Sequence, residues 1–557
     1  MTISFDEEKQ DKKLGEFRKK EEEDLAQIVA HRNGLEYANL TLIPINMDAL
    51  RLIPEKEARE AKVATTSLVG KKVKLAVTSP TNEKIPELVD GLTRKGFEVT
   101  IIVVSTASLE KAWGRYSDLS FSTESKAGAF DISSHDLSTF IEQVKTIEDV
   151  QKIIGEIIKL KKGLRISKIL EIVLSGALSI KASDIHIEPE EKYVRLRYRL
   201  DGVLTNIVDF DLETYGLLLS RIKLLSGLKL NVKSEAQDGR FSIKISEGDI
   251  EIRTSILPGA YSESIVLRIL NPKSIQVPLE ELGIPQKLLS VILKQITRPN
   301  GMILTTGPTG SGKTTTLYAF LKKIHSPDVK IITIEDPIEY HLPGIVQTQV
   351  ESEKNYTFSE GLRSTLRQDP DVIMIGEIRD NETAQIAVNS SLTGHLVFST
   401  LHTNSAAGSF PRLIDLGVNP RIISSAINIT LAQRLVRKLC PHCKQKVEMT
   451  AEEKTKIESI LNSITDKNEI PAEHASHFKP VGCEKCHMTG YIGRIGIYEG
   501  ILTDENINKA IEYSTSEADI QKAASTQGIL TMSQDGIIKV LSGTTSLEEL
   551  ERVIDLK

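Results

Sequence analysis

Eight consecutive residues, Gly307–Thr314 (GPTGSGKT), have the spacing G-x-x-x-x-G-K-[S/T] of a phosphate-binding P-loop. The glycines let the backbone turn its N–H groups inward, toward an anionic phosphate. We expect Lys313 to reach the β- and γ-phosphates of a nucleotide and the Thr314 hydroxyl to coordinate Mg²⁺. The residues expected to bind the nucleotide are Gly307, Pro308, Thr309, Gly310, Ser311, Gly312, Lys313, Thr314 and Thr315.

The flanking sequence favours a P-loop over a glycine-rich turn that has the same pattern by chance. Met302–Thr306 is a short apolar run with β-favouring residues, and Thr314–Ile324 carries helix formers with apolar residues at helical spacing. The loop is therefore predicted to join a strand to a helix, as a P-loop does.

Acidic residues follow two further apolar runs, Lys330–Ile334 and Val372–Ile375, which have the character of buried parallel strands. Ligands of open α/β sheets bind beyond the carboxyl ends of the strands. Phosphoryl transfer to water needs a metal-coordinating acid and a group that positions the water. For each acid taken alone, capping of a helix is the structural alternative. The candidate acids are Glu335, Asp336, Glu339 and Glu377.

Two histidines, His395 and His402, bracket a third apolar run, Leu396–Phe398. A lone histidine is more often a packed or surface residue. Because these two flank a strand of a predicted nucleotide domain, we treat both as candidates for hydrogen bonding to phosphate.

All four cysteines of the chain occur in two C-x-x-C pairs, Cys440 with Cys443 and Cys483 with Cys486. Each pair can supply half of a tetrahedral Cys₄ zinc site, and in a reducing compartment such pairs favour metal over disulfide. The pairs lie about forty residues apart, so an inserted excursion has to bring them together. Free thiols or a redox pair are the less favoured alternatives, and His442 and His487 are lower-ranked ligands.

Arginines are concentrated on strand-like segments between residues 166 and 270, namely Arg195, Arg197, Arg199, Arg240, Arg253 and Arg268. The first three alternate along one predicted strand, so they share one face, and solvent exposure is the simplest interpretation. The last three lie on successive segments and could converge on a phosphate group.

Length and composition predict a soluble protein of several domains, with 557 residues of which 26% are charged and 40% hydrophobic. A net charge of −6 gives no general electrostatic case for nucleic-acid binding. We find no signal-peptide pattern and no apolar run long enough to span a bilayer. A cytoplasmic location is expected, with membrane contact only through partners.

Alternation of apolar runs with helical segments predicts an α/β protein with a doubly wound P-loop core. The predicted parts are a charged arm (1–24), an N-terminal α/β domain (25–115), a linker rich in Ser, Gly and Asp (116–145), a smaller α/β domain (146–275), the P-loop domain (284–501) with its cysteine-bearing subdomain (436–490), and a helical C-terminal segment (502–557).

Taken together, these blocks resemble the secretion ATPases of type II secretion and type IV pilus assembly. The resemblance covers roughly residues 165–545 and is far more specific than a P-loop alone. It rests on the P-loop together with Ser183–Pro189 (SDIHIEP), Asp238–Arg240 (DGR), Thr333–Tyr340 (TIEDPIEY), Leu366–Asp380 (LRQDPDVIMIGEIRD), Thr393–Asn404 (TGHLVFSTLHTN), Gln433–Cys443 (QRLVRKLCPHC) and Thr489–Glu499 (TGYIGRIGIYE).

The resemblance implies a homo-hexameric ATPase that uses ATP and Mg²⁺, in which a smaller domain precedes a RecA-like motor domain. It implies that Glu339 polarises water, beside Glu335 and Asp336, and that Glu377 lies near Mg²⁺. The remaining implied site residues are His395 and His402 of a histidine box, Arg253 and Arg268 reaching the nucleotide from the smaller domain, and the four cysteines on Zn²⁺.

The resemblance further implies a cytoplasmic motor that assembles pili or pseudopili through an inner-membrane platform protein. The zinc subdomain and the N-terminal domain favour assembly or secretion over retraction. A motor for DNA uptake or conjugation is the alternative within the class, against which the acidic charge and sparse aromatics argue. A catalytically silent, nucleotide-gated scaffold is the other alternative, against which the complete set of candidate catalytic residues argues.

Two departures from the family pattern bear on these expectations. Ser262-Glu263 stands near Arg268 where the family usually has Gly-Glu. The N-terminal domain is similar to that of the family at Ala49–Val63, but the R-L-G-x-x-L-like repeat of members that bind cyclic-di-GMP is not matched after Lys13–Gly15. We therefore do not expect regulation by cyclic-di-GMP.

Overall fold

The computed structural model describes residues 21–41, 43, 45–50, 52–116, 122–125, 129–132, 144, 146–158, 162–245, 248–271, 277–351, 355–471 and 475–556. Most of the predicted charged arm, most of the predicted linker and the Lys13–Gly15 segment lie outside these residues. The chain divides into two compact units, residues 1–123 with 156–171, and residues 124–155 with 172–557.

The first unit holds a four-stranded sheet in the order β1-β4-β3-β2. β4 (Glu98–Val103) runs parallel to β1 (Glu36–Tyr37) and β3 (Lys72–Val77), and β2 (Val63–Val69) is antiparallel to β3. Residues 21–33 are helical. The helices that follow are α2 (Met47–Leu50), α3 (Glu55–Ala61), α4 (Ile85–Arg94) and α5 (Thr106–Gly114), and the unit has a hydrophobic core of its own.

The second unit begins with an eight-stranded sheet in the order β5-β6-β10-β11-β12-β7-β8-β9. The strands are β5 (Ser122–Ser125), β6 (Ala129–Ile132), β7 (Asp184–Pro189), β8 (Val194–Leu200), β9 (Val203–Phe210), β10 (Gln237–Ile245), β11 (Gly248–Leu257) and β12 (Ser264–Leu270), and the helices in this part of the chain are α7 (Ile147–Ile158), α8 (Lys162–Ser179) and α9 (Leu212–Leu225). Tyr198 of β8 donates a hydrogen bond of 2.7 Å to the carbonyl oxygen of Val173, so the buried face of the sheet packs on α8.

Alternate residues of β8 point to opposite faces of this sheet, as the period of a strand requires. Tyr198 and the other apolar residues are buried, and the arginines between them are half-buried. The prediction that Arg195, Arg197 and Arg199 share one face is confirmed.

The structure differs from the predicted linker at two points, because β5 and β6 both lie within residues 116–145. β6 pairs in parallel with β10, and β5 beyond it is the edge strand of the eight-stranded sheet. Backbone pairing with an existing edge needs no long apolar run, and so the Ser- and Gly-rich composition did not indicate strands there.

A seven-stranded sheet carries the P-loop, in the order β15-β14-β16-β17-β13-β18-β21. Its parallel strands are β13 (Gly301–Thr306), β14 (Ile331–Glu335), β15 (Val346–Gln349), β16 (Val372–Ile375), β17 (Leu396–Leu401) and β18 (Ile427–Leu439), and β21 (Tyr491–Leu502) is antiparallel to β18. The helices along this part of the chain are α11 (Gln286–Ile296), α12 (Lys313–Ile324), α13 (Phe358–Leu366), α14 (Asn381–Leu392), α15 (Ser409–Asp415) and α16 (Pro420–Ala426).

Consecutive residues of these parallel strands belong to different hydrophobic cores. Met302 and Leu304 lie in one buried cluster, and Ile303 between them lies in another. Because alternate side chains of a strand face opposite sides, both faces of the sheet are covered, and the predicted doubly wound α/β core is confirmed.

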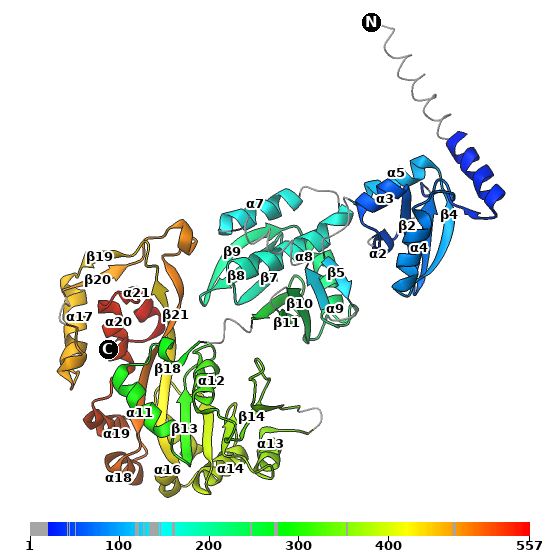
Figure 1. Ribbon diagram of the computed structural model, residues 1–557. Helices are drawn as coiled ribbons and strands as arrows, with labels where there is room; N and C mark the ends of the chain where they lie inside the picture. Colours follow the sequence, from blue (N-terminus) through cyan, green and yellow to red (C-terminus); the bar gives the residue numbers. More distant parts are fainter. Residues whose placement is uncertain are drawn as a thin grey trace. The chain divides into compact units, whose positions relative to one another are not determined.

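An excursion and a helical segment complete the second unit. β19 (Gln445–Glu448) and β20 (Ser476–Lys479) form a two-stranded sheet, with α17 (Ala451–Asn462) between them in the chain. The C-terminal helices are α18 (Glu505–Tyr513), α19 (Glu517–Ala524), α20 (Met532–Leu541) and α21 (Leu547–Val553), and short 3₁₀ turns lie at Leu279–Glu281, Lys467–Glu469, Glu484–Cys486 and Ser525–Gln527. In Figure 1 α20 and α21 lie beside β21, and their apolar residues join one core of the P-loop sheet.

No helix in the described part of the chain combines the length and the apolar character needed to cross a lipid bilayer.

Candidate nucleotide and metal sites

The P-loop connects the end of β13 at Thr306 to the start of α12 at Lys313, which confirms the predicted strand, loop and helix. Gly307, Gly310 and Gly312 have φ angles of +142°, +80° and +89°. These angles lie in the region that favours glycine. A Cβ atom on Gly307 would also stand 2.5 Å from the carbonyl oxygen of Gln433, so the close approach of β18 excludes a side chain there.

Polar groups of the loop suit an anionic ligand. The Ser311 hydroxyl is buried and has no hydrogen-bond partner among the described residues, so a phosphate oxygen would satisfy it. Lys313 Nζ donates to the carbonyl oxygens of Gly307 and Pro308 at 2.8 and 3.2 Å. Burial lowers the pKa of Lys313, and the nearby Glu377 carboxylate opposes that shift. Thr314 and Thr315 lie in the first turn of α12, half-buried.

Gln433 is a supporting residue that sequence reasoning missed. Its Nε2 atom donates a 2.7 Å hydrogen bond to the carbonyl oxygen of Ser311 from beneath the loop. Gln433 lies more than a hundred residues further along the chain, on β18, which is a sheet neighbour of β13. Only the pairing of the two strands reveals this contact.

The acids expected beyond neighbouring strands do lie at the P-loop edge of the sheet. β14, β16, β17 and β13 are consecutive and parallel, so their carboxyl ends share one edge. Glu377 after β16 accepts hydrogen bonds from Arg379 and, at 2.9 Å, from His402 after β17. Arg379 also lies 3.7 Å from Asp336 after β14. The structure therefore brings Asp336, Glu377 and His402 together around Arg379, which was not among the predicted site residues.

Hydrogen bonding fixes the charge of Glu377. Burial tends to raise its pKa, but the hydrogen bonds from Arg379 and His402 prevail, and the pKa lies below its usual range. Glu377 is thus held as a carboxylate, the form that a divalent cation requires.

Glu335 and Glu339 occupy different environments although they are four residues apart. The Glu335 side chain is 2% exposed and accepts hydrogen bonds from Tyr318, from Thr333 at 2.6 Å and from Gln347 at 3.0 Å. Glu339 is partly exposed, and one of its oxygens lies 3.5 Å from Arg253 Nη1. Glu339 is therefore accessible to a ligand beside its contact with Arg253, whereas Glu335 is held in the packing of α12 on β14.

His395, a candidate for hydrogen bonding to phosphate, lies at the edge of the sheet opposite the P-loop. It precedes β17, and its carbonyl oxygen accepts from the N–H of Gly301, the first residue of β13. The P-loop follows the last residue of β13, about 17 Å further along a strand of this length. His395 Nδ1 instead lies 3.1 Å from the carbonyl oxygen of Ser390.

The arginines on successive strands of the smaller sheet lie in register. Arg240 pairs with Arg253, Arg253 with Arg268, and Arg268 with Asp184, which in turn pairs with Arg199. Directly opposed residues share a face, so this row puts four guanidinium groups and one carboxylate on the same side. Arg268 Nε donates to Asp184 at 3.0 Å, and its side chain is 57% exposed.

The departure at Ser262-Glu263 is anchored by a buried ion pair. Glu263 lies 2.6 Å from Lys223 of α9, and both side chains are less than 5% exposed. The Lys223 ammonium also donates to the carbonyl oxygen of Val232 at 2.8 Å. Breaking such a pair typically costs about 3–5 kcal/mol, so the loop that leads to Arg268 is held firmly without the usual glycine.

The two cysteine pairs meet in one cluster, as the sequence predicted. The Sγ atoms of Cys440 and Cys483, and those of Cys443 and Cys486, are 3.8 Å apart, and all four lie within 4.8 Å of one another. A tetrahedral zinc–sulfur site with bonds of about 2.3 Å places its sulfurs about 3.8 Å apart. All four cysteines are free thiols, and neither His442 nor His487 joins the described cluster.

Backbone donors complete the environment of the cysteines. The N–H groups of Gly482, Cys483 and Gly490 point at cysteine sulfurs at 3.4, 3.1 and 3.2 Å. Burial raises the pKa of Cys440 to about 12. A thiolate at such a position needs a cation, and a metal ion supplies one.

Comparison with known proteins decides the family. A family model described as "Type II/IV secretion system protein" matches residues 160–552. This chain belongs to that family. A second model, the MshEN domain, matches residues 33–123.

Two relatives from the secretion ATPase family are similar to this chain over most of its length. The type II secretion system protein E of Aeromonas hydrophila is 46% identical over 388 residues, which are 70% of this chain and 75% of that protein. The type IV pilus assembly ATPase PilB of Myxococcus xanthus is 34% identical over 531 residues, or 95% and 91% of the two chains. The solved ATPase DotB of Yersinia pseudotuberculosis shares the fold, with a TM-score of 0.51 at 19% identity over 71% of this chain and 94% of that one. The chain is an ATP-hydrolysing secretion ATPase.

Proposed function

We propose that this secretion ATPase is a cytoplasmic motor that drives the assembly of type IV pili or type II secretion pseudopili through an inner-membrane platform protein. The observation that carries this proposal is the similarity to a pilus assembly ATPase along 95% of the chain, N-terminal region included. The cysteine cluster and the region that matches the MshEN domain favour assembly or secretion over retraction.

In the proposed cycle, the P-loop binds the phosphates of ATP. Lys313 would contact the β- and γ-phosphates, and the Thr314 hydroxyl would coordinate Mg²⁺. Glu377, kept ionised by Arg379 and His402, would supply a carboxylate to Mg²⁺. Glu339 orients the attacking water, because its carboxylate is accessible where that of Glu335 is not. Asp336 supports this edge through Arg379.

Two arginines of the smaller domain, Arg253 and Arg268, would act on the phosphates of the nucleotide. Arg253 and Arg268 are adjacent across β11 and β12, so their charges act on one region of space. Concentrated positive charge stabilises the negative charge that develops on a transferring phosphoryl group. Within a homo-hexamer, movement of the smaller domain against the motor domain would then follow the nucleotide state.

Purified full-length protein should hydrolyse ATP in a Mg²⁺-dependent way and should have the mass of a hexamer by light scattering. Turnover is measured by phosphate release, with and without DNA and with and without membranes that contain a candidate platform protein. Stimulation by the platform membranes supports the proposal. Stimulation by DNA alone would favour the uptake or conjugation motor, and nucleotide binding without turnover under every condition would favour the scaffold.

Zinc should be bound at one ion per chain, and Cys486→Ser should lose it. Binding free energies of structural zinc sites are about 10–16 kcal/mol in small peptides, so residues 436–490 should become protease-sensitive without the ion. Metal content is measured by atomic emission, and cleavage sites by mass spectrometry. His442→Ala is the matched control and should keep its zinc. Retention of one zinc by Cys486→Ser, or loss of zinc by His442→Ala, would contradict the Cys₄ assignment.

A further inference from the structure

The loop after His402 is tied to the strand that carries the P-loop. The N–H of Thr403 donates to Thr306 Oγ1 at 2.8 Å, and the two hydroxyls are also 2.8 Å apart. Thr306 is the last residue of β13, directly before Gly307. One end of the loop is therefore fixed to the nucleotide site.

The same loop is tied at its other end to a buried carboxylate on β21. The N–H of Ala406 donates to Glu499 Oε1 at 2.8 Å, and Glu499 Oε2 accepts from the N–H of Met532 at 3.2 Å. Met532 is the first residue of α20. Burial raises the pKa of Glu499, and the two backbone N–H groups oppose that shift. A single carboxylate thus joins the His402 loop to the start of a C-terminal helix.

The two residues before Ala406 contact the C-terminal segment as well. Ser405 donates to Glu517 of α19, and Asn404 accepts from Arg434 at 3.2 Å. Arg434 also donates to the carbonyl oxygen of Val553 in α21. Three consecutive loop residues are therefore connected, directly or through one side chain, to α19, α20 and α21.

The strand residue before Glu499 makes the attachment of α20 rigid. The N–H of Tyr498 donates to Asp535 at 2.8 Å, and Asp535 is paired with Lys539 at 2.5 Å. The Tyr498 hydroxyl lies on the opposite side of β21, 3.5 Å from Thr316 of the P-loop helix. Because α20 is fixed to two successive residues of β21, the Glu499 carboxylate cannot follow the loop without moving the helix.

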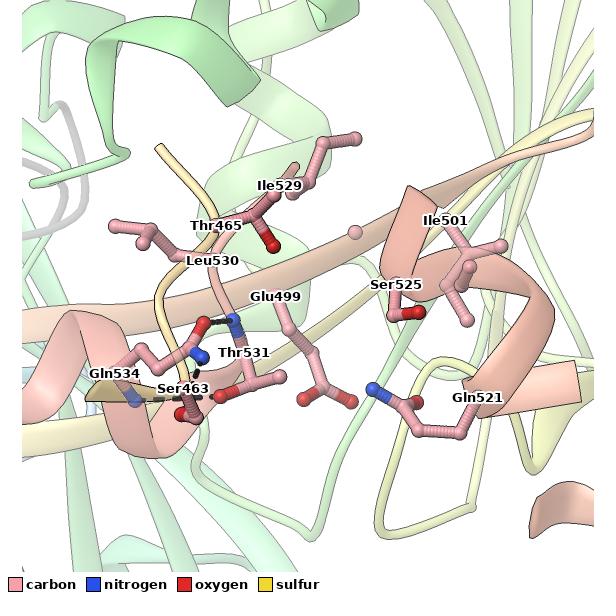
Figure 2. A pocket seen from close by; sticks show the side chains of 12 residues that line it. Ser463, Thr465, Glu499, Ile501, Gln521, Ser525, Ile529, Leu530, Thr531 and Gln534 are labelled. Atoms are coloured by element: carbon pink, nitrogen blue, oxygen red, sulfur yellow. Dashed lines mark hydrogen bonds between the residues drawn. The ribbon is translucent and has the colours of Figure 1, made fainter. Parts of the chain in front are cut away.

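Glu499 lines a small cavity of about 60 Å³ together with Gln521, Thr531 and Gln534. Figure 2 shows its carboxylate among these side chains. A glutamine is isosteric with this glutamate and needs no further room. The substitution Glu499→Gln therefore tests the hydrogen bonds rather than the packing. An amide has one acceptor oxygen, so its NH₂ group must face the N–H of either Ala406 or Met532.

We propose that Glu499 is a positioning residue for ATP hydrolysis, which sets the place of the His402 loop at the nucleotide and couples that loop to the C-terminal helices. The inference rests on the proposed role of His402 at the phosphate edge. It assigns to the C-terminal segment a direct mechanical connection with the site of chemistry. Glu499 touches no reacting atom and acts through the loop.

Glu499→Gln should lower kcat about tenfold, because one lost hydrogen bond to a charged group corresponds to roughly that change in rate. KM for ATP should stay within twofold, since the P-loop is untouched. Phosphate release at varied ATP concentration measures both, with thermal unfolding in parallel. The matched control is Glu549→Gln, which alters a buried carboxylate of α21 that accepts hydrogen bonds from Arg437 and Arg552 rather than from the loop. The Glu549→Gln variant should keep the wild-type kcat even if its melting temperature falls as much as that of Glu499→Gln.

A double-mutant cycle with His402→Ala separates positioning from general stability. If Glu499 acts through His402, Glu499→Gln should lower kcat no further in the His402→Ala background. Additive losses, or equal kcat in the Glu499→Gln and Glu549→Gln variants, would overturn the inference. If Glu499→Gln yields no folded protein, Ser405→Ala at a partly exposed position tests the coupling of the same loop to the C-terminal helices through Glu517, and an unchanged kcat would overturn that coupling. A wild type without turnover is a different outcome, since it would count against the proposed function itself.

Discussion

Replacing Lys313 with alanine is expected to reduce ATP turnover by roughly a hundred- to a thousandfold, the usual loss when a charge-stabilising donor is removed from a transition state. The Lys313 ammonium donates to the carbonyl oxygens of Gly307 and Pro308, within the loop itself. Alanine removes the only side-chain charge in the Gly307–Thr315 stretch. Phosphate release and binding of a fluorescent ATP analogue are the measurements.

The fold should survive this substitution, because the buried residues of α12, such as Leu317 and Phe320, are unaffected. Circular dichroism and thermal unfolding check this point. Lys322→Ala is the matched control, since Lys322 is an exposed lysine on the same helix, and it should hydrolyse ATP at the wild-type rate. Full activity of Lys313→Ala would refute the assignment of the loop to the phosphates.

Glu339→Gln is expected to bind ATP with nearly unchanged affinity and to lose roughly a hundredfold or more in kcat, as is typical for loss of a group that activates water. The amide keeps the size of the side chain and removes the charge that orients and polarises the water. Because Glu339 is partly exposed, the melting temperature of the Glu339→Gln variant should differ little from that of the wild type. Rates are measured by single-turnover hydrolysis, and affinity by equilibrium binding.

Glu335→Gln is the informative partner of that variant. Glu335 accepts three hydrogen bonds in a buried setting, and burial together with this carboxylate raises the pKa of Tyr318, which therefore remains a donor. A glutamine at 335 turns one acceptor into a donor, so it should lower the melting temperature more than Glu339→Gln does. If Glu335→Gln instead folded normally and lost turnover while Glu339→Gln remained active, the roles of the two carboxylates would be exchanged.

The P-loop and the cysteine cluster could be predicted because their information is local. Eight consecutive residues specify the turn, the donors and the lysine of the loop, and two C-x-x-C pairs specify the ligands of a tetrahedral site. The doubly wound core was predictable for a similar reason, since a run such as Val372–Ile375 is apolar on both faces. In each case the physical cause lies within a few residues of its effect.

His395 and His402 flank the same strand in the sequence, but strand direction separates them in the fold. A residue before a parallel strand and a residue after it lie at opposite edges of the sheet, so only His402 can share an edge with the P-loop. That information was available in the sequence. The contact between Gln433 and Ser311 was not, because it depends on which strand pairs with β13.

The separate environments of Glu335 and Glu339 also depend on distant residues. Burial of Glu335 requires Tyr318 on α12 and Gln347 on β15, which the spacing of the acids does not indicate. The register of Arg240, Arg253 and Arg268 likewise follows from hairpin geometry, since a shift of one residue would turn a side chain to the other face.

The cysteine cluster also makes this chain convenient for spectroscopic labelling. Every cysteine of the sequence belongs to the cluster, so metal binding would leave no sulfhydryl open to maleimide reagents. A cysteine introduced on an exposed helical position such as Glu360 of α13 would then be a unique attachment point for a fluorophore or spin label. Movements of the motor could be followed in the native sequence background, without first deleting the natural cysteines as such experiments usually require.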